Sequence, residues 1–210
     1  MNICKKFILI FIFLLFTVNL CLLTGWSNTV NYPLTVIDDT GVPVTFTSEP
    51  QRIVSAAPNN TEILFALGLG NKVVGVTNYD NYPEEVKIIE KIGEISPLNL
   101  EKIITLKPDL VLAFATFQLK EIERLRELGF KVLDIEPLTL KDTLERMKMI
   151  ARVCGIPEQG AKIVENLYQR VEIIKNKVSQ IGSSRKPKVF LLEELTKLSI
   201  PPVLIPSLMS

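Results

Sequence analysis

The sequence contains no histidine among its 210 residues. Without an imidazole there is no Ser–His nucleophile pair, no histidine general base and no His-ligated metal site. Cysteine is scarce as well: Cys4 and Cys21 lie close to the amino terminus and Cys154 stands alone. We therefore expect no disulfide framework, no thiolate cluster and no metal site, and we interpret Cys154 as a small buried hydrophobic residue.

An excess of charge of either sign is also absent. The 24 Lys and Arg residues against 23 Asp and Glu leave a net charge of +1. This balance gives no reason to expect a nucleic-acid partner. The first two apolar runs, within residues 52–86, are not joined by a glycine-rich phosphate loop. No expected strand end places a nucleophile beside a base, so we predict no catalytic residues and no enzymatic activity.

Residues 1–27 have the pattern of a secretory signal peptide. Lys5 and Lys6 precede a long apolar run, and small residues follow it. An uncleaved membrane anchor is the alternative, because the run is long enough to cross a bilayer. Lipidation of Cys21 is disfavoured, since Leu20 is bulky where lipobox sequences carry a small residue. With either reading the functional part lies in the periplasm or the extracellular space.

Beyond the leader, short apolar runs alternate with amphipathic ones. Two strands are expected within residues 28–51, around an Asp38-Asp39 turn that we interpret as solvated. The spacing of Asn59 and Glu62 is that of a capping box and predicts the start of the first helix. Four further strands are predicted at 52–57, 72–77, 110–114 and 131–136, with helices between and after them. This alternation is typical of an α/β fold with a mostly parallel sheet covered on both faces.

The ligand crevice of such a sheet lies beyond the carboxyl ends of its strands. These ends are expected at residues 56–59, 77–82, 114–118 and 136–138. They carry hydroxyl, amide and aromatic groups rather than catalytic pairs. The pattern therefore favours binding over catalysis.

The second half of the chain begins with a helix longer than usual. Residues 28–155 are predicted to form one α/β lobe, and residues 156–182 a single long helix. A strand that opens a second lobe is expected within residues 183–198. Residues 199–210 form a tail in which we recognise neither a helix nor a strand pattern.

Three stretches together resemble a known family: RIVSAAPNNTEILFALGLGNKVVGVTNYDNYPEE, KIGEISPLNLEKIITLKPDLVLA and LRELGFKVLDIEP. They are similar to the amino-terminal lobe of the periplasmic binding proteins that serve ATP-driven importers of cobalamin, iron–siderophores and haem. The similarity runs from about Val36 to Glu193, and its P-x-N-T-E, N-L-E-K-I and L-K-P-D-L motifs are specific. It implies a Rossmann-like lobe joined by one long rigid helix, matched by residues 157–181, to a second lobe, with the ligand between the lobes.

The resemblance also implies a function and a set of ligand-binding residues. The expected protein is the extracytoplasmic solute-binding component of an ABC importer for a metal chelate, cobalamin or an iron–siderophore. Tyr79 and Phe114 match cleft aromatics of cobalamin binders, and Pro58 and Asn59 are expected on the same wall. Ile95 stands where a cobalamin-binding member carries a tryptophan. A chelate brings its own metal ligands and needs shape, stacking and a few hydrogen bonds, which agrees with the lack of histidine.

Glu101 matches the glutamate of the first lobe that docks on arginines of the permease, the membrane subunit of the importer. An exposed charge at a docking surface mainly sets orientation and association rate. Each of these residues also has a simpler interpretation. Tyr79 could pack its own loop, Phe114 could be core at a strand end, and Glu101 could only complement a helix dipole.

The tail LTKLSIPPVLIPSLMS does not resemble the family, whose members continue with a sequence like P-L-Y-T-A-G-x-x-T-F-x-N-E-L. Residues 198–210 can be back-translated so that a shifted frame reads IYTAGINTFFNE. This indicates a frameshift near residues 193–198 and a product that lacks most of its second lobe and binds weakly. A secreted interaction scaffold is the alternative, and a small-molecule-modifying α/β enzyme is disfavoured.

Overall fold

The computed structural model describes residues 30–181. The expected signal peptide, the start of the second lobe and the tail all lie outside these residues. The chain divides into two compact units, residues 1–167 and 168–210. The first unit contains the sheet and its covering helices, and the described part of the second is the end of helix α6 (Pro157–Ser179) and the residues directly after it. No helix within the described part of the chain is long and apolar enough to cross a membrane.

Four parallel strands form the central sheet in the order β4-β3-β5-β6. They are β3 (Ile53–Ser55), β4 (Val73–Val76), β5 (Leu110–Ala113) and β6 (Val132–Asp134). The predicted α/β fold with a parallel sheet is thus confirmed. Because β3 pairs with β4 on one side and with β5 on the other, the chain reverses its direction of winding there. Ligands of open α/β sheets bind at such a switch point.

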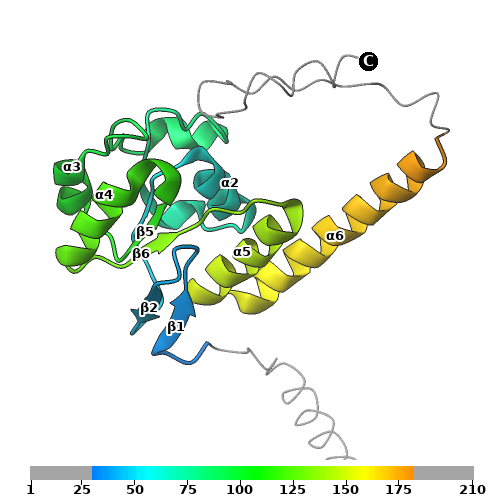
Figure 1. The fold of residues 1–210 in the computed structure, drawn as a ribbon, viewed down its shortest axis with the longest axis horizontal. Coiled ribbons are helices and arrows are strands. Elements are labelled where there is room, and N and C mark those ends of the chain that lie inside the picture. Colours follow the sequence, from blue (N-terminus) through cyan, green and yellow to red (C-terminus); the bar gives the residue numbers. More distant parts are fainter. Residues whose placement is uncertain (1–29, 182–210) are drawn as a thin grey trace, which may run out of the picture. The chain divides into compact units, whose positions relative to one another are not determined.

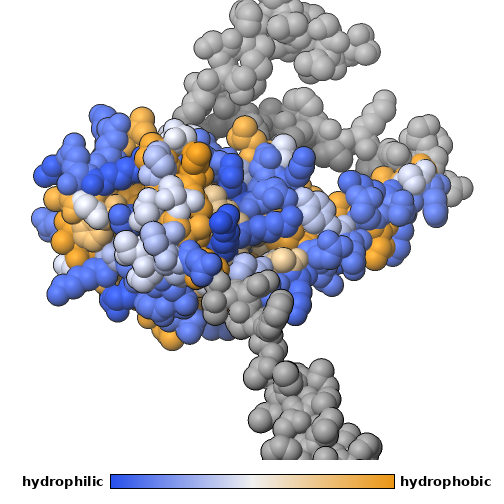
Figure 2. Space-filling model, turned by 90° about the horizontal axis from the view of Figure 1, so that it is seen from below, coloured by the Kyte–Doolittle hydropathy of each residue, from blue (hydrophilic) through white to orange (hydrophobic). Residues whose placement is uncertain are grey.

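Helices cover both faces of this sheet (Figure 1). The covering helices are α2 (Pro58–Ala66), α3 (Leu100–Leu106), α4 (Ala115–Glu127) and α5 (Leu140–Val153), with strands between them in the chain. Apolar residues of the strands, of α3 and α4 and of the loop before α3 pack into one buried cluster, which includes Val54, Ile92, Ile103, Val111, Ile122 and Leu125. On the outside, Figure 2 shows hydrophobic residues in separate patches between hydrophilic ones.

The predicted capping box at Asn59 is wrong. Helix α2 begins at Pro58, with Ala57 as its extended N-cap residue, and no side chain caps it. Proline suits the first helical position because the N–H that it lacks would have no helical partner. Asn59 therefore lies inside the first turn and is exposed. Helix α3, by contrast, has a side-chain cap, since Asn99 accepts a hydrogen bond from the backbone of Lys102 at 3.0 Å.

The first turns of α6 pack closely on α5. A Cβ atom added to Gly160 would lie 2.2 Å from the Cβ of Ala151, so only glycine allows this approach. Val164, one turn further along α6, is fully buried. Cys154, just after α5, is also fully buried as predicted, and burial raises the pKa of its thiol to about 12.

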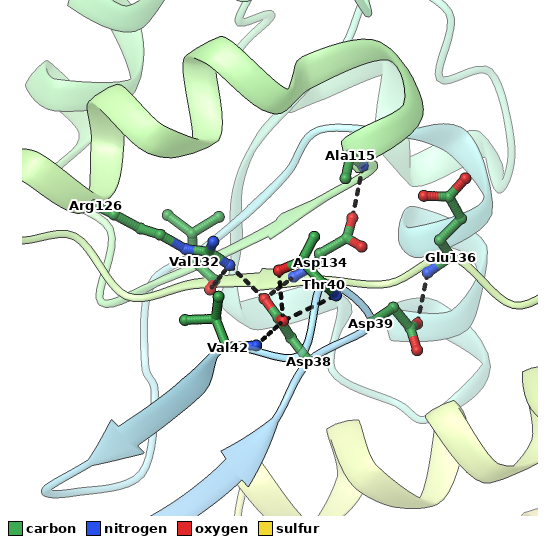
Figure 3. Close-up of polar contacts among 9 residues, drawn as sticks. All are labelled: Asp38, Asp39, Thr40, Val42, Ala115, Arg126, Val132, Asp134 and Glu136. Atoms are coloured by element: carbon green, nitrogen blue, oxygen red, sulfur yellow. Dashed lines mark hydrogen bonds and ion pairs between the residues drawn. The ribbon is translucent and has the colours of Figure 1, made fainter.

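Strands β1 (Leu34–Ile37) and β2 (Pro43–Phe46) form the predicted hairpin. Its turn is not solvated as expected, because Asp38 is only 4 % exposed. One oxygen of the Asp38 carboxylate accepts the backbone N–H groups of Thr40 and Val42, both at 3.0 Å. The other carboxylate oxygen accepts the N–H of Asp134 at 3.2 Å and forms an ion pair with Arg126 (Figure 3).

The hairpin turn covers the open edge of β6. The N–H of Asp39 donates to the carbonyl of Asp134 at 3.2 Å, and the Asp39 carboxylate accepts the N–H of Glu136 at 2.8 Å (Figure 3). Arg146 of α5 donates to the same carboxylate at 2.9 Å. An outer strand with unpaired backbone groups invites association with other chains. The two aspartates satisfy these groups from within the protein.

We expect Asp38→Ala to lower the free energy of unfolding of the full chain by about 3 kcal/mol, because it leaves Arg126 and several N–H groups without their acceptor. Urea unfolding followed by circular dichroism measures this loss. Glu145→Ala is the control, since Glu145 forms only an exposed ion pair with Lys148 at 3.0 Å. Such pairs contribute less than about 1 kcal/mol. Equal losses for the two variants would contradict the structural role of Asp38.

Candidate ligand-binding wall at the strand ends

The carboxyl ends of the four parallel strands meet at one edge of the sheet, together with the loop before α3. The loop joins this edge because the N–H of Asn78, after β4, donates to the carbonyl of Gly93 at 2.8 Å. We call the combined surface the strand-end wall. It consists of residues 56–59, 77–82, 93–98, 114–118 and 136–138.

A single buried amide holds three segments of this wall together. The Nε2 group of Gln118 donates to the carbonyl of Ala56 at 2.6 Å and to that of Ile95 at 2.9 Å. Its Oε1 accepts the N–H of Phe114 at 3.0 Å. Gln118 is fully buried, and its backbone (φ −128°, ψ 17°) interrupts the regular geometry of α4. The sequence analysis did not single out Gln118; the available signal was an amide residue within the strand-end segment 114–118.

A second buried amide joins α2 to the end of β5. Asn60 donates from Nδ2 to the carbonyl of Ala113 at 3.1 Å. The next residue, Thr61, donates from its hydroxyl to that of Ser55 at 2.7 Å. These bonds fix the first turn of α2, and with it Pro58, beside the residue that precedes Phe114. Asn60 was also missed, because only the fold reveals its partner.

The loop after β4 is a closed turn that exposes Tyr79. The carboxylate of Asp80 accepts the N–H of Thr77 at 2.8 Å. The ammonium of Lys91 donates to the carbonyls of Thr77 and Asp80 at 3.1 and 3.0 Å. Tyr79 itself is 57 % exposed, and a hydrogen bond to the Glu94 carboxylate raises the pKa of its phenol. The turn therefore presents an aromatic side chain on a constrained backbone.

Phe114 and Phe117 form an aromatic pair at the start of α4. Their ring centroids lie 5.4 Å apart with an angle of 34° between the ring planes. Phe114 is half-buried, whereas Phe117 is 45 % exposed. Such a pair offers apolar area with little conformational entropy to lose on binding. Phe117 is a further residue of the wall that the sequence analysis did not single out.

Asp134 fixes the backbone beside this aromatic pair. One oxygen of its carboxylate accepts the N–H of Ala115 at 2.6 Å (Figure 3). Burial raises the pKa of Asp134 to about 6, against the lowering effect of the Ala115 hydrogen bond, and the charges of Glu136, Asp38 and Asp39 raise it further. The start of α4 thus depends on a carboxylate in an unfavourable environment.

The structure brings together most of the residues predicted for ligand binding. Pro58, Ile95 and Phe114 lie in the segments held by Gln118 and Asn60, and Tyr79 contacts Glu94, the neighbour of Ile95. Their roles in binding remain predictions.

Glu101 lies on another element, in the first turn of α3, where it is exposed. It borders a surface hollow that is also lined by Glu90, Asn99, Lys102, Thr105 and Leu106.

The chemistry of the wall is that of binding. Its segments offer aromatic rings, backbone groups and a few polar side chains, as small-molecule sites do. Within residues 30–181 no group of three or more His, Cys, Asp or Glu side chains is placed to hold a metal ion. An α/β lobe with such a wall at its switch point belongs to the class of small-molecule binding domains.

Comparison with known proteins identifies the family. Residues 53–204 match the periplasmic binding protein family, and the chain belongs to it. Membership places the chain among binding proteins rather than enzymes. The matched range extends past the described residues and into the stretch interpreted above as a tail.

The chain is 37 % identical over 169 residues to an uncharacterized ABC transporter substrate-binding lipoprotein, YvrC, of Bacillus subtilis (strain 168), covering 79 % of this chain and 54 % of that protein. It is 36 % identical over 136 residues to the vitamin B12-binding protein of Vibrio vulnificus (strain YJ016), covering 64 % and 50 %. The crystal structure of the periplasmic vitamin B12 binding protein BtuF of Vibrio cholerae aligns with a TM-score of 0.58 and 34 % identity, over 62 % of this chain and 52 % of that one. The chain therefore spans about half the length of the curated relatives that it matches.

The raised pKa of Asp134 predicts how stability changes with pH. Because the pKa is about 6 in the folded chain and ordinarily 3.8, the folded state binds this proton more tightly, and the contribution of Asp134 to stability falls as the pH rises from about 4 to 6. Asp134→Asn keeps an oxygen for Ala115 and removes the charge. We expect its free energy of unfolding, relative to the parent chain, to rise by about 2 kcal/mol between pH 4 and pH 7.

Urea unfolding at the two pH values measures this change. The control is Glu123→Gln on the exposed side of α4. A difference between Asp134→Asn and the parent that stays constant with pH would show that Asp134 is not destabilised by its surroundings.

Proposed function

We propose that this chain is the extracytoplasmic solute-binding component of an ABC importer, and that its ligand is a metal chelate. The observation that carries the proposal is the strand-end wall, which places Tyr79 and the Phe114–Phe117 pair around a rigid hydrogen-bonded backbone. The names of similar proteins agree with it, since they include vitamin B12-binding proteins and a possible iron-binding protein of Staphylococcus epidermidis. Cobalamin, an iron–siderophore and haem are the candidate ligands.

The residues of the wall suit a ligand that arrives with its metal already coordinated. The chain has no histidine, and the hydrogen bond to Glu94 raises the pKa of the Tyr79 phenol, which disfavours a phenolate ligand. Stacking on aromatic rings and hydrogen bonds to loop carbonyls remain available. These interactions recognise the organic shell of a chelate rather than its metal.

The 210-residue chain by itself is expected to bind weakly. In the arrangement that the family resemblance implies, a second lobe covers the other side of the ligand. A ligand held by one wall keeps much of its surface in water, whereas tight small-molecule sites bury most of it. We therefore expect a ligand that contacts this wall alone to bind weakly.

We further propose that the protein is exported by residues 1–27 and that its partner is the permease of the importer. Glu101 is the candidate docking residue. It is exposed in the first turn of α3, outside the strand-end wall. A docking contact there would leave the wall free for the ligand.

Equilibrium dialysis of the folded full chain against cyanocobalamin, a ferric siderophore or haem tests ligand binding through the absorbance of the chelate itself. We expect saturable binding of one chelate and a loss of about tenfold in affinity for Phe114→Ala, because the aromatic pair is lost. Leu128→Ala is the control, since this exposed residue lies at the other end of α4. No detectable binding of any chelate by the folded chain would overturn the proposal and favour a protein-interaction role.

Docking is tested by the binding of the chain to its cognate permease in nanodiscs. We expect Glu101→Lys to weaken binding about tenfold or more, since a like charge would face the permease arginines. Its chelate affinity should stay unchanged. Glu123→Lys on α4 is the matched charge reversal and should leave docking unaffected. Equal effects of the two reversals would show that Glu101 is not a specific contact.

A further inference from the structure

The charge of the strand-end wall is one-sided. Its five segments contain the carboxylates of Asp80, Glu94 and Glu136 but neither lysine nor arginine, and the whole chain has no histidine. Asp80 is buried, Glu136 is half-buried and Glu94 is exposed. A ligand on this wall therefore meets negative charge without a compensating side-chain cation from the wall itself.

Lys91, the lysine bonded to the wall from outside it, is turned toward the protein. Its ammonium donates to the carbonyls of Thr77 and Asp80, at 3.1 and 3.0 Å, and so closes the turn that carries Tyr79. Moving this ammonium to an anionic ligand would break both hydrogen bonds. Lys91 thus stabilises the loop rather than offering a charge to the ligand.

The amino terminus of α4 also points to this edge, and helix amino termini attract anions. Here the donors are already used within the protein. The N–H of Ala115 donates to the Asp134 carboxylate at 2.6 Å, and that of Phe114 donates to Gln118 at 3.0 Å. The negative charge that this helix end favours is therefore supplied, at least at these two N–H groups, by the protein itself.

Glu94 is the exposed carboxylate best placed to act on a ligand. It accepts a hydrogen bond from the side-chain amide of Asn78 at 2.6 Å and a second from Tyr79. Its neighbour Ile95 is held by Gln118. The carboxylate is thus fixed between two residues proposed to contact the ligand.

We infer that the strand-end wall selects an uncharged or cationic chelate and discriminates against chelates with several carboxylate or catecholate groups. This inference rests on the proposed function and narrows its ligand class. Uncharged amide-rich corrinoids and neutral or cationic ferric hydroxamates fit the wall. Chelates with a large negative charge would face repulsion from Glu94 and Glu136, with no cation of the wall to offset it.

A charge series on one iron hydroxamate core tests the inference. Ferrioxamine B carries a free ammonium, its N-acetyl derivative is neutral and its N-succinyl derivative is anionic. Equilibrium dialysis of the folded full chain at low salt should give an affinity that falls by roughly twofold to fivefold at each step toward negative charge, and the differences should shrink at high salt. Cyanocobalamin and its carboxylic acid derivatives, made by hydrolysis of amide side chains, form a second matched series.

Glu94→Gln should reduce the difference between the cationic and anionic members of each series. The control is Glu127→Gln, because Glu127 ends α4, about 18 Å along the helix from its start. Equal affinities across a series that binds, or tighter binding of the anionic member, would overturn the charge inference alone. No binding by any member, nor by haem, in a folded sample would overturn the proposed function and the inference with it.

Discussion

The structure depends on how backbone groups are satisfied where the parallel strands end. Beyond that edge the ladder of the sheet stops, yet its last carbonyls are buried and need donors. Gln118 donates to the carbonyl of Ala56 and to that of Ile95 in the loop before α3. Asn60 donates to the carbonyl of Ala113, which also accepts the N–H of Ile135 at 3.1 Å. The same bonds that complete the sheet therefore position the proposed ligand wall. Gln118 uses both ends of its buried amide, whereas Asn60 uses its Nδ2 group and its buried Oδ1 atom has no hydrogen-bond partner among the described residues.

Side chains also satisfy backbone groups at the outer edge of the sheet. The hairpin turn places Asp38 and Asp39 against β6, where their carboxylates accept N–H groups that no neighbouring strand could accept. Asp134 continues this network inward and ends on the N–H of Ala115, next to the aromatic pair. The network of side chains that covers the edge strand therefore also positions the strand-end wall. Substitutions in the hairpin turn should therefore alter the start of α4 as well as lower the overall stability.

The proposed binding mode follows from which groups of the wall are exposed and which are already engaged in hydrogen bonds within the protein. Its aromatic rings are presented to solvent, whereas its carboxylates and its adjoining ammonium are engaged in holding loops. Recognition by shape and stacking suits a large chelate that shields its own metal. The one-sided charge adds selectivity, because repulsion of a wrong ligand discriminates as effectively as attraction of the right one. Both features belong to this lobe alone, whatever covers the other side of the ligand.

Local patterns in the sequence determined the order of strands and helices, because these depend mainly on neighbouring residues. Composition alone supplied the prediction that a chelate rather than a bare metal ion is bound, because the chain has no histidine. The Asn59 cap was predicted wrongly, since Pro58 is the first helical residue and the N-cap is Ala57, two residues before Asn59. Asp38 was misjudged because its partner Arg126 lies 88 residues away. Gln118 escaped notice for the same reason, as the carbonyl of Ala56 is 62 residues distant. Only the tertiary structure decided which polar residues are buried, because burial depends on partners that the fold brings together.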